Sequence, residues 1–80
     1  MIPFDWIELA NKRIKDQVIK TPLTYDEGLN IYIKWENQQV TGSFKARGAL
    51  NKVLSLQPWE LLNGLVTCSA GNHGQGVALA

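Results

Sequence analysis

The sequence predicts an α/β fold, in which parallel strands are joined by helices as β-α-β units. Two β-rich stretches, at residues 30–36 and 65–69, alternate with stretches in which apolar residues recur at helical spacing. A strand, a helix and a second strand are most simply arranged as a parallel pair with a right-handed crossover. The predicted order is therefore helix, strand, helix, strand, helix.

The first half of the chain predicts one helix and one strand. Asp5 and Glu8 have the spacing of a capping box at the start of a helix over about residues 5–19. Thr21-Pro22 ends this helix, because the residue before a proline disfavours helical geometry. Residues 30–36 alternate apolar with polar or aromatic side chains, as in a strand. The apolar face of the helix comprises Ile7, Ala10, Ile14 and Val18.

The second half predicts a helix from Ser43, a short helical turn in PWELL (residues 58–62), a strand at 65–69 and a Gly-rich turn into a last helix. Two strands are too few for a parallel sheet, which is normally covered on both faces. We therefore expect these 80 residues to be the N-terminal segment of a longer catalytic domain, or part of an assembly that completes the sheet. The apolar face of the helix from Ser43 comprises Ala46, Ala49, Leu50, Val53 and Leu54.

Composition narrows the classes of partner. The net charge is +1, from 8 basic and 7 acidic residues, which gives no electrostatic reason to expect nucleic acid or an anionic membrane. One cysteine and one histidine allow neither an intrachain disulfide nor a zinc site, and a single reduced thiol fits a cytoplasmic protein. No apolar run is long enough to span a membrane. A small molecule or another protein is the expected partner.

The stretch TGSFKARGAL, residues 41–50, places two cations in the first turn of the predicted helix with no acid beside them. The helix dipole makes Lys45 and Arg47 each unfavourable there by about 0.3 to 1 kcal/mol. One interpretation is that both side chains point into water. The other is that Lys45, partly desolvated by Phe44, loses its proton easily and supplies the neutral amine that imine chemistry needs.

The stretch CSAGNHGQG, residues 68–76, is a second candidate site. Free N–H groups and the dipole at a helix start can bind a carboxylate or phosphate. A simpler interpretation makes Asn72 an N-cap that forms a capping box with Gln75, His73 a structural residue, and Cys68 a buried residue of the strand. The glycine order GxxGxG gives only weak support to a nucleotide-binding βα module.

Two motifs together closely resemble a known family. They are KWENQQVTGSFKARGALNK, residues 34–52, and TCSAGNHGQGVALA, residues 67–80. They resemble the N-terminal region of the fold type II pyridoxal-phosphate (PLP) enzymes, which have a tryptophan synthase β-like fold. Within these, the chain is most similar to the threonine/serine dehydratases (threonine ammonia-lyases) and the related serine racemases. The resemblance implies PLP as cofactor, a small amino-acid substrate and a homo-oligomer.

The resemblance also implies roles for individual residues. Lys45 would hold PLP as an internal Schiff base and take the Cα proton of the substrate. Phe44 would pack beside the pyridine ring, and Asn72 would contact the 3'-oxygen of the cofactor. No metal is implied. The substrate carboxylate would be surrounded, mainly through backbone N–H groups, by Ser69, Ala70, Gly71, Asn72 and His73.

The implied activity is dehydration and deamination of L-threonine, L-serine or both to a 2-oxo acid and ammonia. Serine racemases typically carry a second serine where this chain has Ala70, and its absence favours elimination over a racemase-like activity. The family's phosphate-binding loop lies downstream of the matched motifs, so we expect the 80-residue chain alone to be inactive. The alternative from another class is a non-catalytic remnant or binding fragment of the family.

Overall fold

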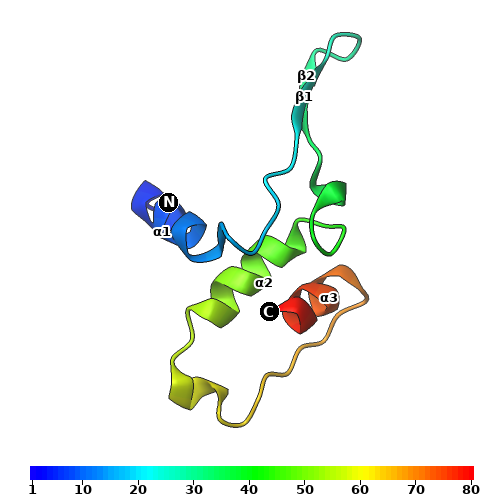
Figure 1. Ribbon diagram of the computed structural model, residues 1–80. Coiled ribbons are helices and arrows are strands. Elements are labelled where there is room, and N and C mark those ends of the chain that lie inside the picture. The colour runs from blue at the N-terminus through cyan, green and yellow to red at the C-terminus, as the bar shows by residue number, and fades with distance from the viewer.

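The computed structural model describes residues 1–80, and a central helix organises them (Figure 1). Two 3-10 turns, η1 (Glu36–Gln38) and η2 (Pro58–Leu61), lie on either side of this helix in the sequence. The remaining elements, in chain order, are α1 (Phe4–Ile14), β1 (Leu23–Asp26), β2 (Ile31–Lys34), α2 (Lys45–Leu54) and α3 (Asn72–Leu79).

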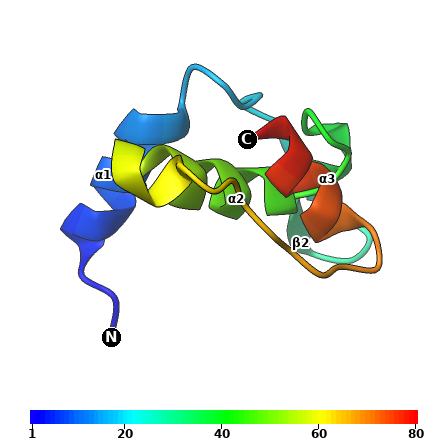
Figure 2. The ribbon, with the colours of Figure 1, turned by 90° about the horizontal axis from the view of Figure 1, so that it is seen from below.

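Helix α2 lies between α1 and α3 and carries most of the small core (Figures 1 and 2). Ala46, Ala49 and Leu50 are buried, as their helical spacing predicts, and Leu50 is only 1% exposed. Helix α1 packs against α2 through buried Ile14, and Arg13 Nη1 donates a hydrogen bond to Asn51 Oδ1 at 2.6 Å. The contacts of α2 therefore hold the three helices together.

The first helix lies where the sequence predicts it, but its length and its N-terminal cap differ from the prediction. It ends at Ile14, although the prediction extended to residue 19, and Val18 lies beyond its end. Its N-cap is Pro3 with no side-chain hydrogen bond, so the expected capping box of Asp5 and Glu8 does not form. Asp5 instead lies inside the first turn, where the helix dipole favours its negative charge.

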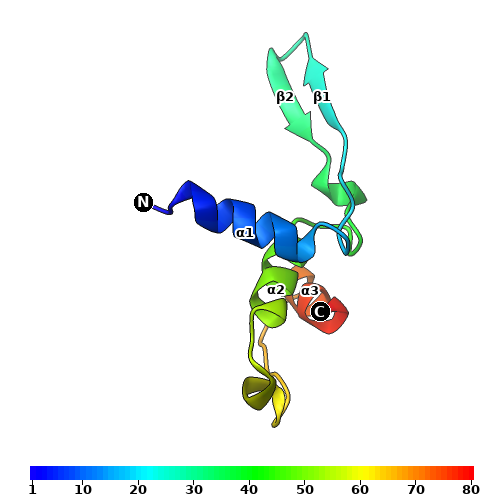
Figure 3. The same cartoon turned by 60° about the vertical axis from the view of Figure 1, so that its left-hand side comes forward.

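The sheet differs from the predicted one. Strand β2 confirms the strand expected at residues 30–36, but it pairs antiparallel with β1, which the sequence analysis did not predict. The connection is a tight turn in which Asn30 has φ +54° and Asp26 Oδ1 accepts a hydrogen bond from the N–H of Leu29 at 2.9 Å. This hairpin projects away from the helices and packs against none of them (Figure 3).

The strand predicted at residues 65–69 is absent, so residues 1–80 contain no parallel pair of strands. A strand forms only where its backbone N–H and C=O groups find a partner, and none lies beside this segment. Val66 is completely exposed, and Cys68, which we expected to be buried, is exposed as well. The PWELL stretch, in contrast, forms the expected short turn, η2.

The molecule is less compact than a globular domain of 80 residues normally is. Its Cα radius of gyration is 14.8 Å, whereas a compact domain of this length would have about 12 Å. Only 8 of 80 residues are buried, and large apolar side chains of α1, the hairpin and the 61–66 segment are exposed. No helix is long and apolar enough to cross a membrane. No group of His, Cys, Asp and Glu side chains could hold a metal ion.

We predict that Leu50→Ala lowers the free energy of unfolding by about 2 to 4 kcal/mol, because it removes the one large side chain that is fully buried. Leu54→Ala, on the same helix, is the matched control, since Leu54 is 40% exposed and should cost much less. Denaturant unfolding of the longest natural chain that contains these residues would measure both. Equal costs for the two variants would contradict the assigned core.

Candidate active site

The first turn of α2 presents the side chain of Lys45. A tight turn precedes it, in which Gly42 has φ +79° and its N–H donates to the carbonyl of Gln39 at 2.8 Å. Ser43 is buried, and its Oγ accepts a hydrogen bond from the backbone N–H of Lys45 at 3.3 Å. The helix therefore begins at Lys45 with a local hydroxyl satisfying one of its free N–H groups.

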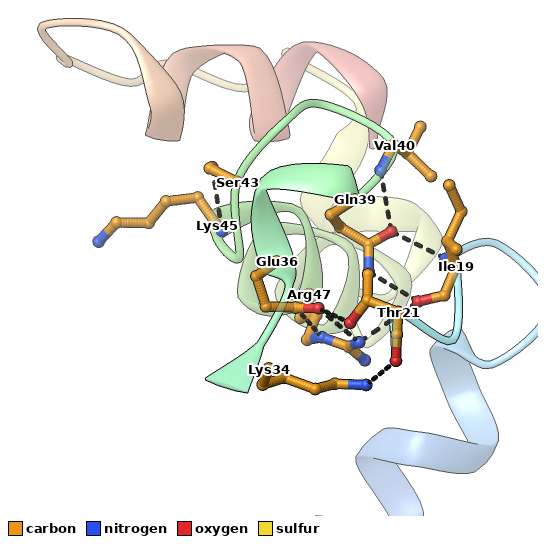
Figure 4. A network of polar contacts seen from close by, with 9 residues as sticks. All are labelled: Ile19, Thr21, Lys34, Glu36, Gln39, Val40, Ser43, Lys45 and Arg47. Atoms are coloured by element: carbon orange, nitrogen blue, oxygen red, sulfur yellow. Dashed lines mark hydrogen bonds and ion pairs between the residues drawn. The ribbon is translucent and has the colours of Figure 1, made fainter. Parts of the chain in front are cut away.

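The amine of Lys45 is accessible and has no polar partner. Its Nζ lies 5.2 Å from the centre of the Phe44 ring, and it makes no hydrogen bond or ion pair. Figure 4 shows this side chain pointing away from the polar network around Glu36. The expected neighbour Phe44 is thus beside the amine, but Phe44 is 61% exposed and does not shield it from water.

Arg47, the second cation of this turn, has an acidic partner that the sequence analysis missed. Its Nε forms an ion pair with Glu36 Oε1, and its Nη2 donates to Oε2 at 3.1 Å (Figure 4). The interpretation that both cations point into water is therefore wrong for Arg47. Glu36 lies 11 residues earlier in the chain, outside the spacing that pairs charges along one helix.

The ion pair shifts the pKa of both groups. The Arg47 guanidinium bound to Glu36 lowers the pKa of that carboxyl to about 2; the hydroxyl of Thr21, which donates to Glu36 Oε2, also lowers it. Partial burial acts in the opposite direction; it is weaker than the contact with Arg47 but stronger than the contact with Thr21. The same pairing raises the pKa of Arg47 above its ordinary value.

The network also ties two preceding segments to the start of α2 (Figure 4). Gln39, which is buried, makes two hydrogen bonds of 2.8 Å with Ile19, one accepting from its N–H and one donating to its carbonyl. Lys34 Nζ donates to the carbonyl of Thr21 at 2.6 Å, and Arg47 Nη2 donates to the carbonyl of Ile19 at 3.3 Å. These contacts fix the direction from which the chain enters α2.

The second motif forms a turn and the start of α3, as predicted, but with a different cap. Helix α3 begins at Asn72, its N-cap is Gly71, and no side chain caps it, so the expected capping box of Asn72 and Gln75 does not form. Ser69 Oγ accepts a hydrogen bond from the N–H of Gly71 at 3.1 Å. The five residues of the predicted carboxylate site, residues 69–73, are all exposed. The first N–H groups of α3 are therefore accessible to a ligand.

The two motifs meet where α3 packs against α2. Gly76 of α3 is buried, and a Cβ at this position would lie 3.1 Å from the Cβ of Ala49 and 3.1 Å from the carbonyl oxygen of Lys45. Helix α3 thus contacts the very residue that carries the free amine. Figure 1 shows the two helices side by side. The sequence analysis did not single out Gly76, although a small residue inside a helix is a signal of close packing.

Two clefts lie beside these helices, and Lys45 lines neither. An apolar cleft of about 350 Å³ separates α2 and α3 from the 65–67 segment, and its lining includes Val53, Leu65, Val77 and His73. A polar cleft of about 380 Å³ lies on the other side of α2, with Lys15, Lys20, Lys34 and Arg47 in its lining. The amine of Lys45 is therefore on an open surface.

Comparison with known proteins identifies the family. The family model for pyridoxal-phosphate dependent enzymes matches residues 14–80. The chain belongs to this family. The cofactor of the family is pyridoxal phosphate, and the free amine of Lys45 suits it, because a primary amine without an acidic partner can form an imine with the cofactor's aldehyde.

Individual relatives cover the whole chain. An L-threonine ammonia-lyase of Thermotoga maritima is 48% identical over 100% of this chain and 21% of its own length. The L-threonine dehydratase biosynthetic IlvA of Halalkalibacterium halodurans is 46% identical over 96% of this chain and 20% of its own length. A serine racemase of Dictyostelium discoideum is 46% identical over 92% of this chain and 25% of its own length. The chain thus spans a fifth to a quarter of the length of these relatives.

We predict that Glu36→Gln lowers the free energy of unfolding at neutral pH by about 1 to 3 kcal/mol, because it breaks a charge-assisted pair. Since the folded pKa of Glu36 is about 2, below its ordinary 4.5, the pair stabilises the fold above pH 4.5 and is lost as the pH falls toward 2. The difference between wild type and variant should therefore shrink over that range in denaturant unfolding. Glu8→Gln, at an exposed position of α1, is the control and should change the free energy of unfolding at neutral pH by less than about 0.5 kcal/mol.

Proposed function

We propose that the protein containing this chain catalyses the PLP-dependent dehydration and deamination of L-threonine, L-serine or both, to a 2-oxo acid and ammonia. The observation that carries this proposal is the unpaired amine of Lys45 on the first turn of α2, against which α3 packs through Gly76. The names of the relatives from Thermotoga maritima and Halalkalibacterium halodurans support the reaction class.

Three residues would hold the cofactor. Lys45 would bind it covalently through Nζ, Phe44 would lie against its ring, and Asn72 would contact its 3'-oxygen. The contact between Phe44 and the amine supports the first two assignments. Asn72 Nδ2 and Oδ1 are free for this role, because the cap of α3 is Gly71 and does not use the side chain of Asn72.

The turn before α3 would bind the substrate carboxylate. Residues 69–73 present backbone N–H groups at a helix start, where the dipole favours an anion. A carboxylate fixed there orients the Cα–H bond of the amino acid relative to the Lys45 amine. Bound PLP would supply the electron sink that makes this proton acidic. The substrate amine would displace Lys45 from the cofactor, and the freed Lys45 amine would accept the Cα proton while the β-hydroxyl leaves as water.

We infer further that residues 1–80 form the N-terminal segment of a fold type II catalytic domain. The open shape, the exposed apolar side chains and the unpaired 65–69 segment support this interpretation. Pairing of that segment with strands outside these residues would restore the parallel arrangement that the sequence predicts. A cytoplasmic location stays a prediction from the single thiol. A homo-oligomer stays a prediction from the family resemblance.

We predict that borohydride reduction of the longest natural chain with PLP labels Lys45 selectively, as read by peptide mass mapping, and that this protein converts threonine to 2-oxobutanoate. Lys45→Ala should abolish both the label and the conversion, since no other amine occupies this position. Lys52→Ala, on an exposed position of the same helix, should leave both unchanged. Label scattered over several lysines, without threonine turnover, would favour a non-catalytic remnant.

A racemase activity is the second candidate, supported by the serine racemase relative of Dictyostelium discoideum. Ala70 argues against it, because racemisation needs a proton donor on the opposite face of Cα and a methyl group supplies none. We predict that L-serine gives pyruvate in large excess over D-serine, and that Ala70→Ser increases the D-serine fraction. Chiral chromatography of the products measures the ratio, and D-serine as the main wild-type product would overturn the assignment.

A further inference from the structure

We propose that Gly76 is a positioning residue that sets how closely the turn at residues 69–73 approaches the Lys45 end of α2. The proposal rests on the proposed function, because the distance matters only if the Lys45 amine and a bound carboxylate act on the same substrate. Gly76 itself touches neither substrate nor cofactor in this assignment. It would act through the separation of the two helices that carry those groups.

The contact at Gly76 has no room for a side chain. A methyl group there would lie 3.1 Å from the Ala49 Cβ, 3.1 Å from the Lys45 carbonyl oxygen and 3.3 Å from the Lys45 carbonyl carbon. Carbon atoms in contact are normally about 3.5 to 4.0 Å apart. Because two of the three close atoms belong to the backbone of α2, they cannot turn aside as a flexible side chain would. A methyl group would therefore push the two helices apart.

A shift at Gly76 would reach the carboxylate-binding turn. Gly76 follows Asn72 by four residues, about one turn of helix, so the first turn of α3 moves with it. Two of the three contact atoms belong to Lys45 itself, so the shift changes the position of the turn relative to the residue that bears the amine. Relieving the contact needs a movement of a few tenths of an ångström, so the rate should fall by less than the roughly 100-fold that a misplacement of about 1 Å can cost.

The other glycines of these helices do not have this property. A Cβ at Gly48, in α2, would meet nothing within 4 Å, and a Cβ at Gly74, in α3, would make an ordinary 3.5 Å contact with the Cβ of Ser69. Alanine is also the better helix former at each position. Gly48→Ala is therefore a matched control, which adds the same methyl group to a helix without touching α3.

The test compares Gly76→Ala, Gly48→Ala and the double variant Gly76→Ala/Ala49→Gly in the longest natural chain. We expect Gly76→Ala to lower kcat/KM for threonine by roughly 5- to 10-fold, with Lys45 still labelled by PLP and borohydride. Gly48→Ala should stay within about twofold of wild type. The double variant should recover part of the activity, because it removes the Ala49 methyl group from the contact.

The double variant distinguishes a positioning role of Gly76 from a role in stability alone. Ala49→Gly weakens the helix, so it should lower resistance to denaturant while it raises kcat/KM in the Gly76→Ala background. A merely structural role for Gly76 would require activity and stability to fall together. Unchanged kcat/KM in Gly76→Ala, with wild-type turnover intact, would overturn the proposal and leave the proposed function standing.

A structural measurement keeps the proposal testable if the proposed function fails. Crystal structures of the wild type and Gly76→Ala without cofactor should show a wider separation between Cα 76 and the Lys45 carbonyl in the variant. An unchanged separation would overturn the proposal whatever the enzyme does. If Gly76→Ala does not fold, Ala49→Ser adds one atom to the facing side of the same contact and should lower kcat/KM in the same way.

Discussion

The ion pair between Glu36 and Arg47 determines where the first turn of α2 lies. It joins that turn to the segment after β2, and the hydroxyl of Thr21 attaches the segment after α1 to the same carboxylate. Only 8 of 80 residues are buried, so hydrophobic packing alone does little to fix the position of this part of the chain. The pair is also directional, since two nitrogens of the guanidinium contact the two oxygens of the carboxylate. The position of Lys45 follows from it.

The two cations of the first turn therefore have separate roles. Arg47 uses its charge within the chain, in the network with Glu36 and Ile19. Lys45, two residues earlier, projects in another direction and leaves its charge unpaired (Figure 4). A first turn with two cations is unfavourable for a helix, and the partner of Arg47 compensates part of that cost. The unfavourable interaction with the helix dipole that remains is that of Lys45, the residue that carries the proposed chemistry.

Local patterns in the sequence predicted the helices and strands whose formation depends mainly on residues close to them in the chain. The helix around Ala46, Ala49 and Leu50, the strand at residues 31–34 and the helix after Gly71 all follow from periodicity and turn residues. The antiparallel β1 is the local arm of a hairpin, whose Gly- and Asn-containing turn was an unread signal in the sequence. The acidic partner of Arg47 and the irregular 65–69 segment instead depend on which other segments lie beside them. Periodicity carries no information about such partners. The residues of the candidate site were identified through the family's two motifs, and the packing of α3 on α2 required the structure.

Cys68 has a practical consequence for work with this protein. It is the one thiol of these residues, it is exposed, and it lies in the irregular 65–69 segment, three positions before Gly71. Air oxidation of these residues would join two copies by a single disulfide and could not continue to longer polymers, since each copy offers one sulfur. The bond would hold the two turns at residues 69–73 close to each other. A thiol-reactive dye at the same sulfur would place one reporter beside that turn.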